Sequence, residues 1–256
     1  MTARTARPES RRGNAMFTES QQRTAARVAG FVLLLLMAAG FFSQIFVPAK
    51  LIVADDAAAT AQNILDSERL FRIGAAADVL IFAADIVMAV AFYVLLKAVS
   101  PGLALLATLW RTAQATIMIT NTIAFLSVPA VLSDPGNADR LETGQLEALA
   151  NTYIGVHTTG FSVGLVMLAM GNAVFAYLLL KSRYVPKALA AWGVFANIVL
   201  ATFTLAILIF PGAEDTAAIA AGRYVPVFFF EVILGGWLLT KSVRLPQTTE
   251  PVAVAR

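Results

Sequence analysis

The sequence has no cysteine and only one histidine among its 256 residues. Without cysteine, a disulfide framework, a thiolate nucleophile, an iron–sulfur cluster and a cysteine-ligated zinc site are all excluded. The single histidine excludes any metal site that needs two histidines from one chain. Charged residues are also scarce, at 14%, where soluble domains carry about 25%. The composition therefore excludes an ordinary soluble enzyme and any disordered or fibrous class.

Apolar residues are abundant instead. They make up 59% of the chain, and the mean hydropathy is +0.75. A membrane-spanning helix needs roughly 20 apolar residues, and six stretches reach about that length. The sequence therefore predicts an all-α fold, a polytopic integral membrane bundle of six transmembrane helices. The predicted spans are Val28–Val47, Ile73–Leu96, Leu103–Leu132, Ile154–Leu180, Ala188–Phe210 and Tyr224–Thr240.

The distribution of lysine and arginine predicts the orientation of these spans. Thirteen of the 19 basic residues lie in the two tails and in the loops on the same side, five lie in the opposite loops, and Arg111 lies inside a span. Since basic residues concentrate on the cytoplasmic side, both termini are expected to be cytoplasmic (N-in/C-in). The net charge of +3 follows from this pattern, so no nucleic-acid partner is expected. The predicted location is the cell inner (plasma) membrane.

The predicted division of the chain is a basic cytoplasmic tail over residues 1–26, a transmembrane domain over 27–241 and a disordered cytoplasmic tail over 242–256. Outside the spans, Asp55–Phe71 is alanine-rich and opens with capping carboxylates, which predicts a short helix near the membrane interface. The loop beginning Ser133-Asp134-Pro135-Gly136-Asn137 carries a turn signal. It continues into a second predicted helix at Arg140–Asn151.

Polar residues inside the spans are the candidate functional groups, because intramembrane charge is costly and usually faces a bundle interior. With a rise of about 1.5 Å per residue, Asp85 and Arg111 both lie about 18 Å below the outer boundary. The short Lys97–Gly102 connection makes their spans neighbours. We therefore predict an intramembrane Asp85–Arg111 pair.

The same arithmetic places Asp78, Asn121, His157 and Glu231 within about 10 Å of the outer boundary. Together with the Asp85–Arg111 pair they predict a polar pocket that opens outward. In this interpretation Asp78, Glu231 and His157 are catalytic candidates, since their side chains suit acid–base chemistry. Four further residues are ligand-binding candidates: Asp85, Arg111, Gln114 and Asn121.

Each of these groups also has a structural explanation. The Asp85–Arg111 pair would pin two helices together, and His157 would donate to a loop carbonyl. The glycines at 160, 164 and 171 would form a helix-packing stripe on the fourth span. Glu231 has few cationic partners, which favours a proton-carrying or acid–base role. Asp78, His157 and Glu231 are ligand types for a metal, but no supporting motif is present, so no metal site is predicted and a cofactor stays unknown.

Four segments together resemble the bacterial multi-pass membrane family catalogued as domain of unknown function 4386. The segment carrying most of the resemblance, at Asp55–Val99, reads DDAAATAQNILDSERLFRIGAAADVLIFAADIVMAVAFYVLLKAV. The others are ARVAGFVLLLLMAAG, LALLATLWRTAQATIMITN and GFSVGLVMLAMGNAVFAYLLLKSRYVPKALAAWGV. The resemblance covers most of the chain and implies a six-helix integral membrane protein, but it transfers no catalytic residue.

Three classes of function remain open. The first is a membrane protein that binds a small hydrophobic or lipid-like molecule of isoprenoid type in the polar pocket, with an enzymatic action on it left undecided. The second is a proton-coupled transporter of small hydrophobic solutes. The third is a non-catalytic sensor or partner subunit. The lipid bilayer is an expected partner in all three, and a homo-oligomer stays open.

Overall fold

The computed structural model describes residues 18–210, 212–213 and 216–244. These residues form helices joined by short loops, with no strand among them. Most of the two predicted tails, residues 1–17 and 245–256, lies outside the described residues. The helices are α1 (Glu19–Phe41), the π-helix η1 (Phe42–Phe46), α2 (Val47–Leu51), α3 (Ala57–Asp66), α4 (Glu68–Leu96), α5 (Pro101–Ser133), α6 (Pro135–Ala138), α7 (Thr143–Ser182), α8 (Lys187–Ile209) and α9 (Ala217–Thr240).

Six helical segments are long and apolar enough to cross a membrane, which confirms the predicted number of spans. Helices suit this environment because each one satisfies its backbone hydrogen bonds internally, where no water can do so. The first span includes α1, η1 and α2 as one continuous rod of 33 residues. The other five correspond to α4, α5, α7, α8 and the last 20 residues of α9.

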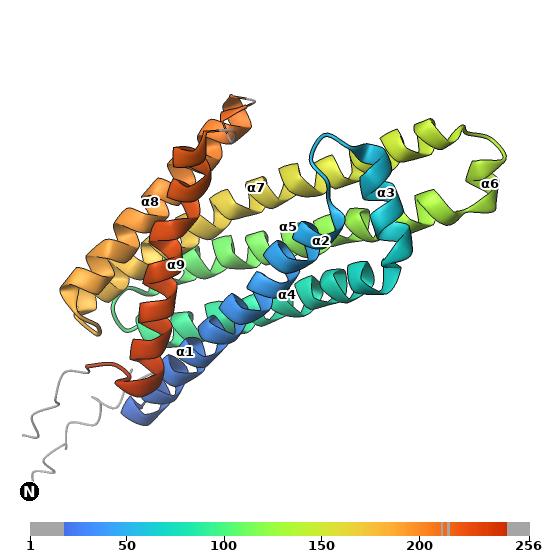
Figure 1. Cartoon of the computed structure of the whole chain (residues 1–256). Coiled ribbons are helices and arrows are strands. Elements are labelled where there is room, and N and C mark those ends of the chain that lie inside the picture. Colours follow the sequence, from blue (N-terminus) through green and yellow to red (C-terminus); the bar gives the residue numbers. More distant parts are fainter. Residues whose placement is uncertain (1–17, 211, 214–215, 245–256) are drawn as a thin grey trace, which may run out of the picture.

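The six long helices pack as a closed ring. Each contacts its neighbour along the chain, and α9 closes the ring by packing on α1. In Figure 1 the start of α1 and the end of α9 lie together at one end of the bundle. The Ser242 hydroxyl lies 3.5 Å from the Arg23 carbonyl oxygen there. We call this the terminal end, and the opposite end, which carries α3 and α6, the loop end.

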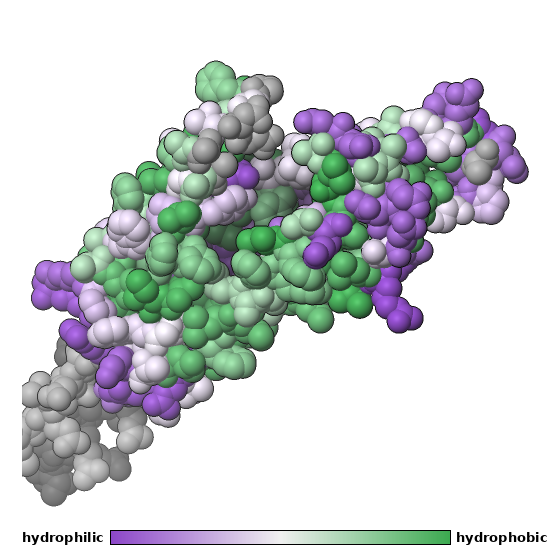
Figure 2. All heavy atoms as spheres, in the orientation of Figure 1, coloured by the Kyte–Doolittle hydropathy of each residue, from purple (hydrophilic) through white to green (hydrophobic). Residues whose placement is uncertain are grey.

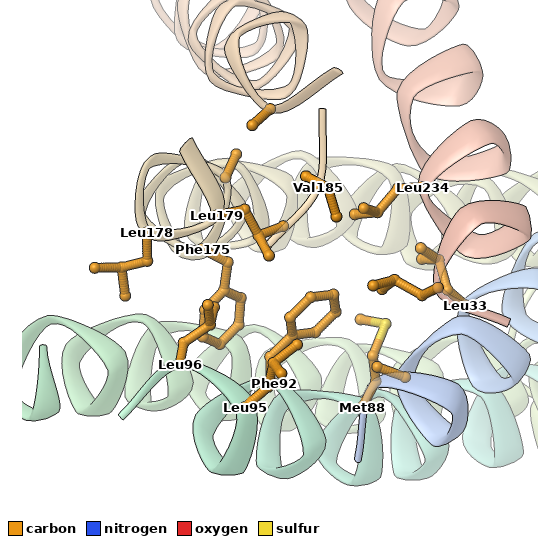
Figure 3. Packing of buried hydrophobic residues seen from close by; sticks show 14 of the residues in the cluster. Leu33, Met88, Phe92, Leu95, Leu96, Phe175, Leu178, Leu179, Val185 and Leu234 are labelled. Carbon is orange, nitrogen blue, oxygen red and sulfur yellow. The ribbon is translucent and has the colours of Figure 1, made fainter. Parts of the chain in front are cut away.

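Close contacts between glycines let α9 close the ring. A Cβ atom added at Gly30 in α1 would lie 2.7 Å from the Gly235 carbonyl oxygen in α9, so the two backbones nearly touch. The main apolar core lies inside the ring, next to the place where α9 crosses α1. Figure 3 shows Leu33, Met88, Phe92 and other labelled side chains converging from α1, α4, α7 and α9.

The structure corrects several predicted boundaries. Helix α1 begins at Glu19 rather than near residue 28, because Thr18 forms a capping box with Gln21. The helix predicted at residues 140–151 is not separate, since its residues from Thr143 onward are the first turns of the 40-residue α7. Pro226 lies inside α9, not in its first turn, because the helix begins earlier, at Ala217.

The predicted interfacial helix within residues 55–71 is present but shorter. Helix α3 ends at Asp66, and α4 begins two residues later, at Glu68. Asp56 caps α3, its carboxylate accepting from the Ala59 N–H at 2.8 Å. The predicted turn near Asp134 is also present, where that carboxylate accepts from the Gly136 N–H.

Candidate functional site

Four helices each contribute one strongly polar side chain to the same level of the ring. Asp85 comes from α4, Arg111 from α5, Asn172 from α7 and Glu231 from α9. Measured along its own helix from the terminal end, each lies about 13–17 Å inward. Glu231 lies within electrostatic range of both Arg111 and Asp85. We call these four residues the central polar site.

The predicted Asp85–Arg111 pair is present. The Arg111 Nη2 atom donates to Asp85 Oδ1 and forms a salt bridge with it. Gln114 supports the same carboxylate, donating from Nε2 to Asp85 Oδ2 at 3.2 Å. Both charges are buried, with 5% of Asp85 and 2% of Arg111 exposed. Asp85 therefore anchors the guanidinium, while Arg111 Nε and Nη1 have no hydrogen-bond partner among the residues that the structure describes.

The glycine stripe of α7 makes room for the polar side chains of α5. A Cβ atom at Gly171 would lie 2.9 Å from Arg111 Cγ. A Cβ atom at Gly164 would likewise overlap Met118, and one at Gly160 would overlap Asn121. The stripe is thus a helix-packing face, as in the structural explanation of these residues. At Gly171 it also fixes where the Arg111 side chain lies.

Glu231 is the most accessible member of the central polar site. Its Oε1 atom accepts from Asn172 Nδ2 at 3.1 Å, and its side chain is partly exposed. Both residues line a cavity of about 20 Å³. The other lining residues are apolar and come from α1, α4, α7 and α9. The cavity thus combines one acid and one amide with apolar walls.

The helices on either side of this cavity separate toward the loop end. In Figure 1, α9 crosses α1 steeply and then diverges from it. Figure 2 shows a hollow between the upper part of α9 and the region of α2 and α3. The outer surface on both sides of the hollow is mostly hydrophobic, as expected for a surface that faces lipid. Glu231 is also less completely buried than Arg111, which is 2% exposed.

The predicted single pocket of Asp78, Asn121, His157 and Glu231 is wrong in one respect, because Glu231 lies elsewhere. His157 and Asn172 are 15 residues apart in α7, which separates His157 from the Glu231–Asn172 contact by about 22 Å along the helix. The predicted last span starts at Tyr224, whereas α9 begins seven residues earlier, at Ala217. Counted from Tyr224, the depth of Glu231 below the outer boundary is too small. Measured from the terminal end instead, Glu231 is level with Arg111.

Asn121 and His157 form a separate contact between α5 and α7. The Asn121 Nδ2 atom donates to the His157 carbonyl oxygen at 2.6 Å and lies 3.1 Å from His157 Nδ1. The His157 ring stacks on Phe125, with 4.2 Å between ring centroids. This geometry links two helices near the loop end.

Asp78 also lies apart from Glu231, against the π-helix η1. Its Oδ1 atom accepts from Gln44 Nε2 at 2.6 Å. It is seven residues from Asp85 on α4, or about 10 Å along the helix. The catalytic roles of Asp78 and His157 stay predictions from the sequence, since neither side chain joins the central polar site.

Sequence reasoning left out three polar residues of these contacts: Asn172, Gln44 and Ser43. Asn172 follows Gly171 directly and is level with Arg111, so depth matching from the terminal end would have found it. The side chains at 43 and 44 belong to the π-helix η1, and no sequence signal marked that helix.

The architecture and the buried polar residues define a class, the polytopic helical membrane proteins with a polar interior. Within this class the particular family is also shown. The family described as Domain of unknown function (DUF4386) matches residues 28–242, and the chain belongs to it. The resemblance stated from the sequence is thereby confirmed. No curated protein and no solved structure matches the chain.

Proposed function

We propose that this protein binds the polar end of a small amphipathic molecule, of isoprenoid type, at Glu231 and Asn172. One observation carries the proposal: Glu231, a partly exposed residue, lines a cavity whose remaining walls, apart from Asn172, are apolar. Ligand sites commonly combine apolar walls with a few convergent polar groups. An acid at this depth is costly to keep, which supports a functional reason for its presence.

The size of the cavity limits what part of a ligand enters it. Its volume of about 20 Å³ is near the space that one water molecule requires. A single hydroxyl or similar group fits there, and the apolar remainder of the molecule would lie between α1 and α9 and in the bilayer. The separation of these two helices toward the loop end supports lateral access from lipid.

The chemistry of the lining favours a ligand that donates a hydrogen bond. A carboxylate is an acceptor with several lone-pair positions, and among the described residues Asn172 donates the one hydrogen bond that Glu231 accepts. If the protein also acts on the bound molecule, Glu231 would be its general acid or base. Arg111 would stabilise developing charge, and Asp85 would hold Arg111 in place.

Mass spectrometry of molecules that co-purify in mild detergent tests the proposal. Wild-type protein is expected to retain a discrete amphipathic compound, and Glu231→Gln is expected to lose it. Glu68→Gln is the matched control, because it makes the same chemical change on the surface, where Glu68 pairs with Arg72. Bulk phospholipid alone on all three proteins would contradict ligand binding and would favour a sensor or partner subunit.

Proton-coupled transport is the second candidate, and the charge balance of the central polar site favours it. Two carboxylates and one guanidinium lie within electrostatic range there, so one acid has no matching cation. Intramembrane acids of this kind often carry protons. Solute flux into proteoliposomes that follows a pH gradient and stops in Glu231→Gln would support transport, including transport by a homo-oligomer. Flux independent of the gradient would contradict it.

We also propose that the protein lies in the plasma membrane of a bacterial cell with both termini cytoplasmic, as the basic residues predict. The absence of cysteine makes this simple to test. Gly102 and Gly144 both have open space where a side chain would be added, and they lie at the terminal end and the loop end. A membrane-impermeant thiol reagent applied to intact spheroplasts is expected to label Gly144→Cys and not Gly102→Cys. The reverse pattern would invert the topology.

A further inference from the structure

A second buried acid has neighbours of a different kind. Asp78 is 2% exposed and accepts from Gln44 Nε2 at 2.6 Å. The Ser43 side chain lies beside the same carboxyl group. Ser43 is itself only 4% exposed, and its hydroxyl oxygen has no hydrogen-bond partner. One acid, one amide and one hydroxyl thus meet between the first span and α4.

The two residues that approach this carboxyl group are consecutive members of the π-helix η1. Consecutive side chains of an α-helix point in clearly different directions. In η1 the turn is widened, and the Val47 N–H bonds to the Phe42 carbonyl oxygen, five residues back. Such π-helical turns occur often at functional sites. Here both Ser43 and Gln44 lie against Asp78 of α4.

Nearby cations do not balance the charge of Asp78. On α5, Arg111 forms its salt bridge with Asp85. On α2, Lys50 is exposed at the end of the helix. On α4 itself, Arg72 pairs with Glu68 at the surface. The polar groups that interact with Asp78 are the uncharged Ser43 and Gln44.

A proton bound to the Asp78 carboxyl group would add a hydrogen-bond donor to this site. An ionised carboxyl group only accepts hydrogen bonds, whereas a protonated one also donates. Gln44 Nε2 already donates to Asp78, so a protonated Asp78 would have a hydrogen left to donate, and the hydroxyl of the neighbouring Ser43 can accept one. The same proton would remove a buried charge that has no counter-ion, and burial of an unpaired ion costs far more than burial of a neutral group.

We propose that Asp78, Ser43 and Gln44 form a proton-binding site that holds η1 against α4. The proton resides on the Asp78 carboxyl group, and its release leaves an unpaired charge and loosens this contact. The proposal does not depend on ligand binding at Glu231, since Asp78 lies about 10 Å along α4 from the level of Asp85.

Infrared spectroscopy of the purified full chain tests the site directly. The carbonyl band of protonated carboxylic acids is expected in the wild type at neutral pH, and the part of it that comes from Asp78 is expected to be lost in Asp78→Asn. The matched control is Asp66→Asn, because Asp66 also accepts from a glutamine, Gln62, at 2.8 Å but is exposed. That variant should keep the band. An identical band in wild type and Asp78→Asn would overturn the proposal.

Thermal unfolding as a function of pH is the second measurement. A proton bound in the folded state stabilises it at low pH, and this contribution is lost as the pH rises through its release. The wild type is therefore expected to lose stability relative to Asp78→Asn on alkalinisation, whereas Asp66→Asn should follow the wild type. Failure of Asp78→Asn to fold would also contradict the proposal, because asparagine is the nearest uncharged equivalent. Ser43→Ala then gives an independent readout, since it should shift the carboxyl band without abolishing it.

Discussion

The two buried acids of α4, Asp78 and Asp85, lie seven residues apart on one face of the helix but have different kinds of partner. Asp85 pairs with Arg111 and is supported by Gln114. In the described part of the chain, the polar neighbours of the Asp78 carboxyl group are the uncharged Gln44 and Ser43. The same residue type in the same helix thus forms an ion pair in one place and a neutral polar contact in the other. The neighbouring helix decides which, because α5 supplies a guanidinium and η1 supplies an amide and a hydroxyl.

Among the substitutions that test this comparison, removing the partner of a buried charge should lower the free energy of unfolding most. Asp85→Ala leaves Arg111 buried without its counter-ion, so we expect a loss of about 3–5 kcal/mol in the free energy of unfolding. Arg111→Ala should cost a similar amount. Unfolding by denaturant titration in detergent measures both.

The exchanged pair, Asp85→Arg with Arg111→Asp, is the control for this prediction. It restores opposite charges and should recover part of the stability that either single substitution removes. Equal instability of the exchanged pair and the single variants would show that the charges themselves are not what stabilises the contact.

Displacing the Arg111 guanidinium without removing it should cause an intermediate loss of stability. Gly171→Ala places a methyl group 2.9 Å from Arg111 Cγ, and such overpacking typically costs about 1–3 kcal/mol. Gly155→Ala is the matched control on α7, because nothing lies within 4 Å of its added Cβ. The control should be neutral or stabilising by up to about 1 kcal/mol, as alanine favours helix. Equal effects of the two would contradict close packing at Arg111.

Removing the hydroxyl beside Asp78 should have the smallest effect. Ser43→Ala deletes one neutral hydrogen-bonding group, for which we expect a loss of about 1 kcal/mol. Ser127→Ala is the control, since Ser127 is partly exposed and its hydroxyl donates to the Ile123 carbonyl oxygen of its own helix. That variant should remain within about 0.5 kcal/mol of the wild type. A loss at Ser43 as large as that of Asp85→Ala would mean that Asp78 is also charged.

Depth along the helix was enough to predict some contacts and not others. Asp85 and Arg111 lie on consecutive spans joined by a short loop, so matching depth nearly ensured that they meet. Glu231 lies on the last span, whose start was placed too late. Its contact with Asn172 also depends on which helices adjoin across the ring, and a single sequence carries no such information.

The sequence by itself determined that this is a six-span membrane protein and that the acid at 85 is paired with the arginine at 111. Hydrophobic length and local connection carry that information, because both act within one helix or between neighbours. Only the tertiary structure decided that α9 closes on α1 through Gly30 and Gly235, which brings Glu231 to the level of Arg111. It also decided that the turn at residues 42–46 widens toward Asp78. These features depend on packing between segments far apart in the chain, where the fit of surfaces, rather than local pattern, selects the arrangement.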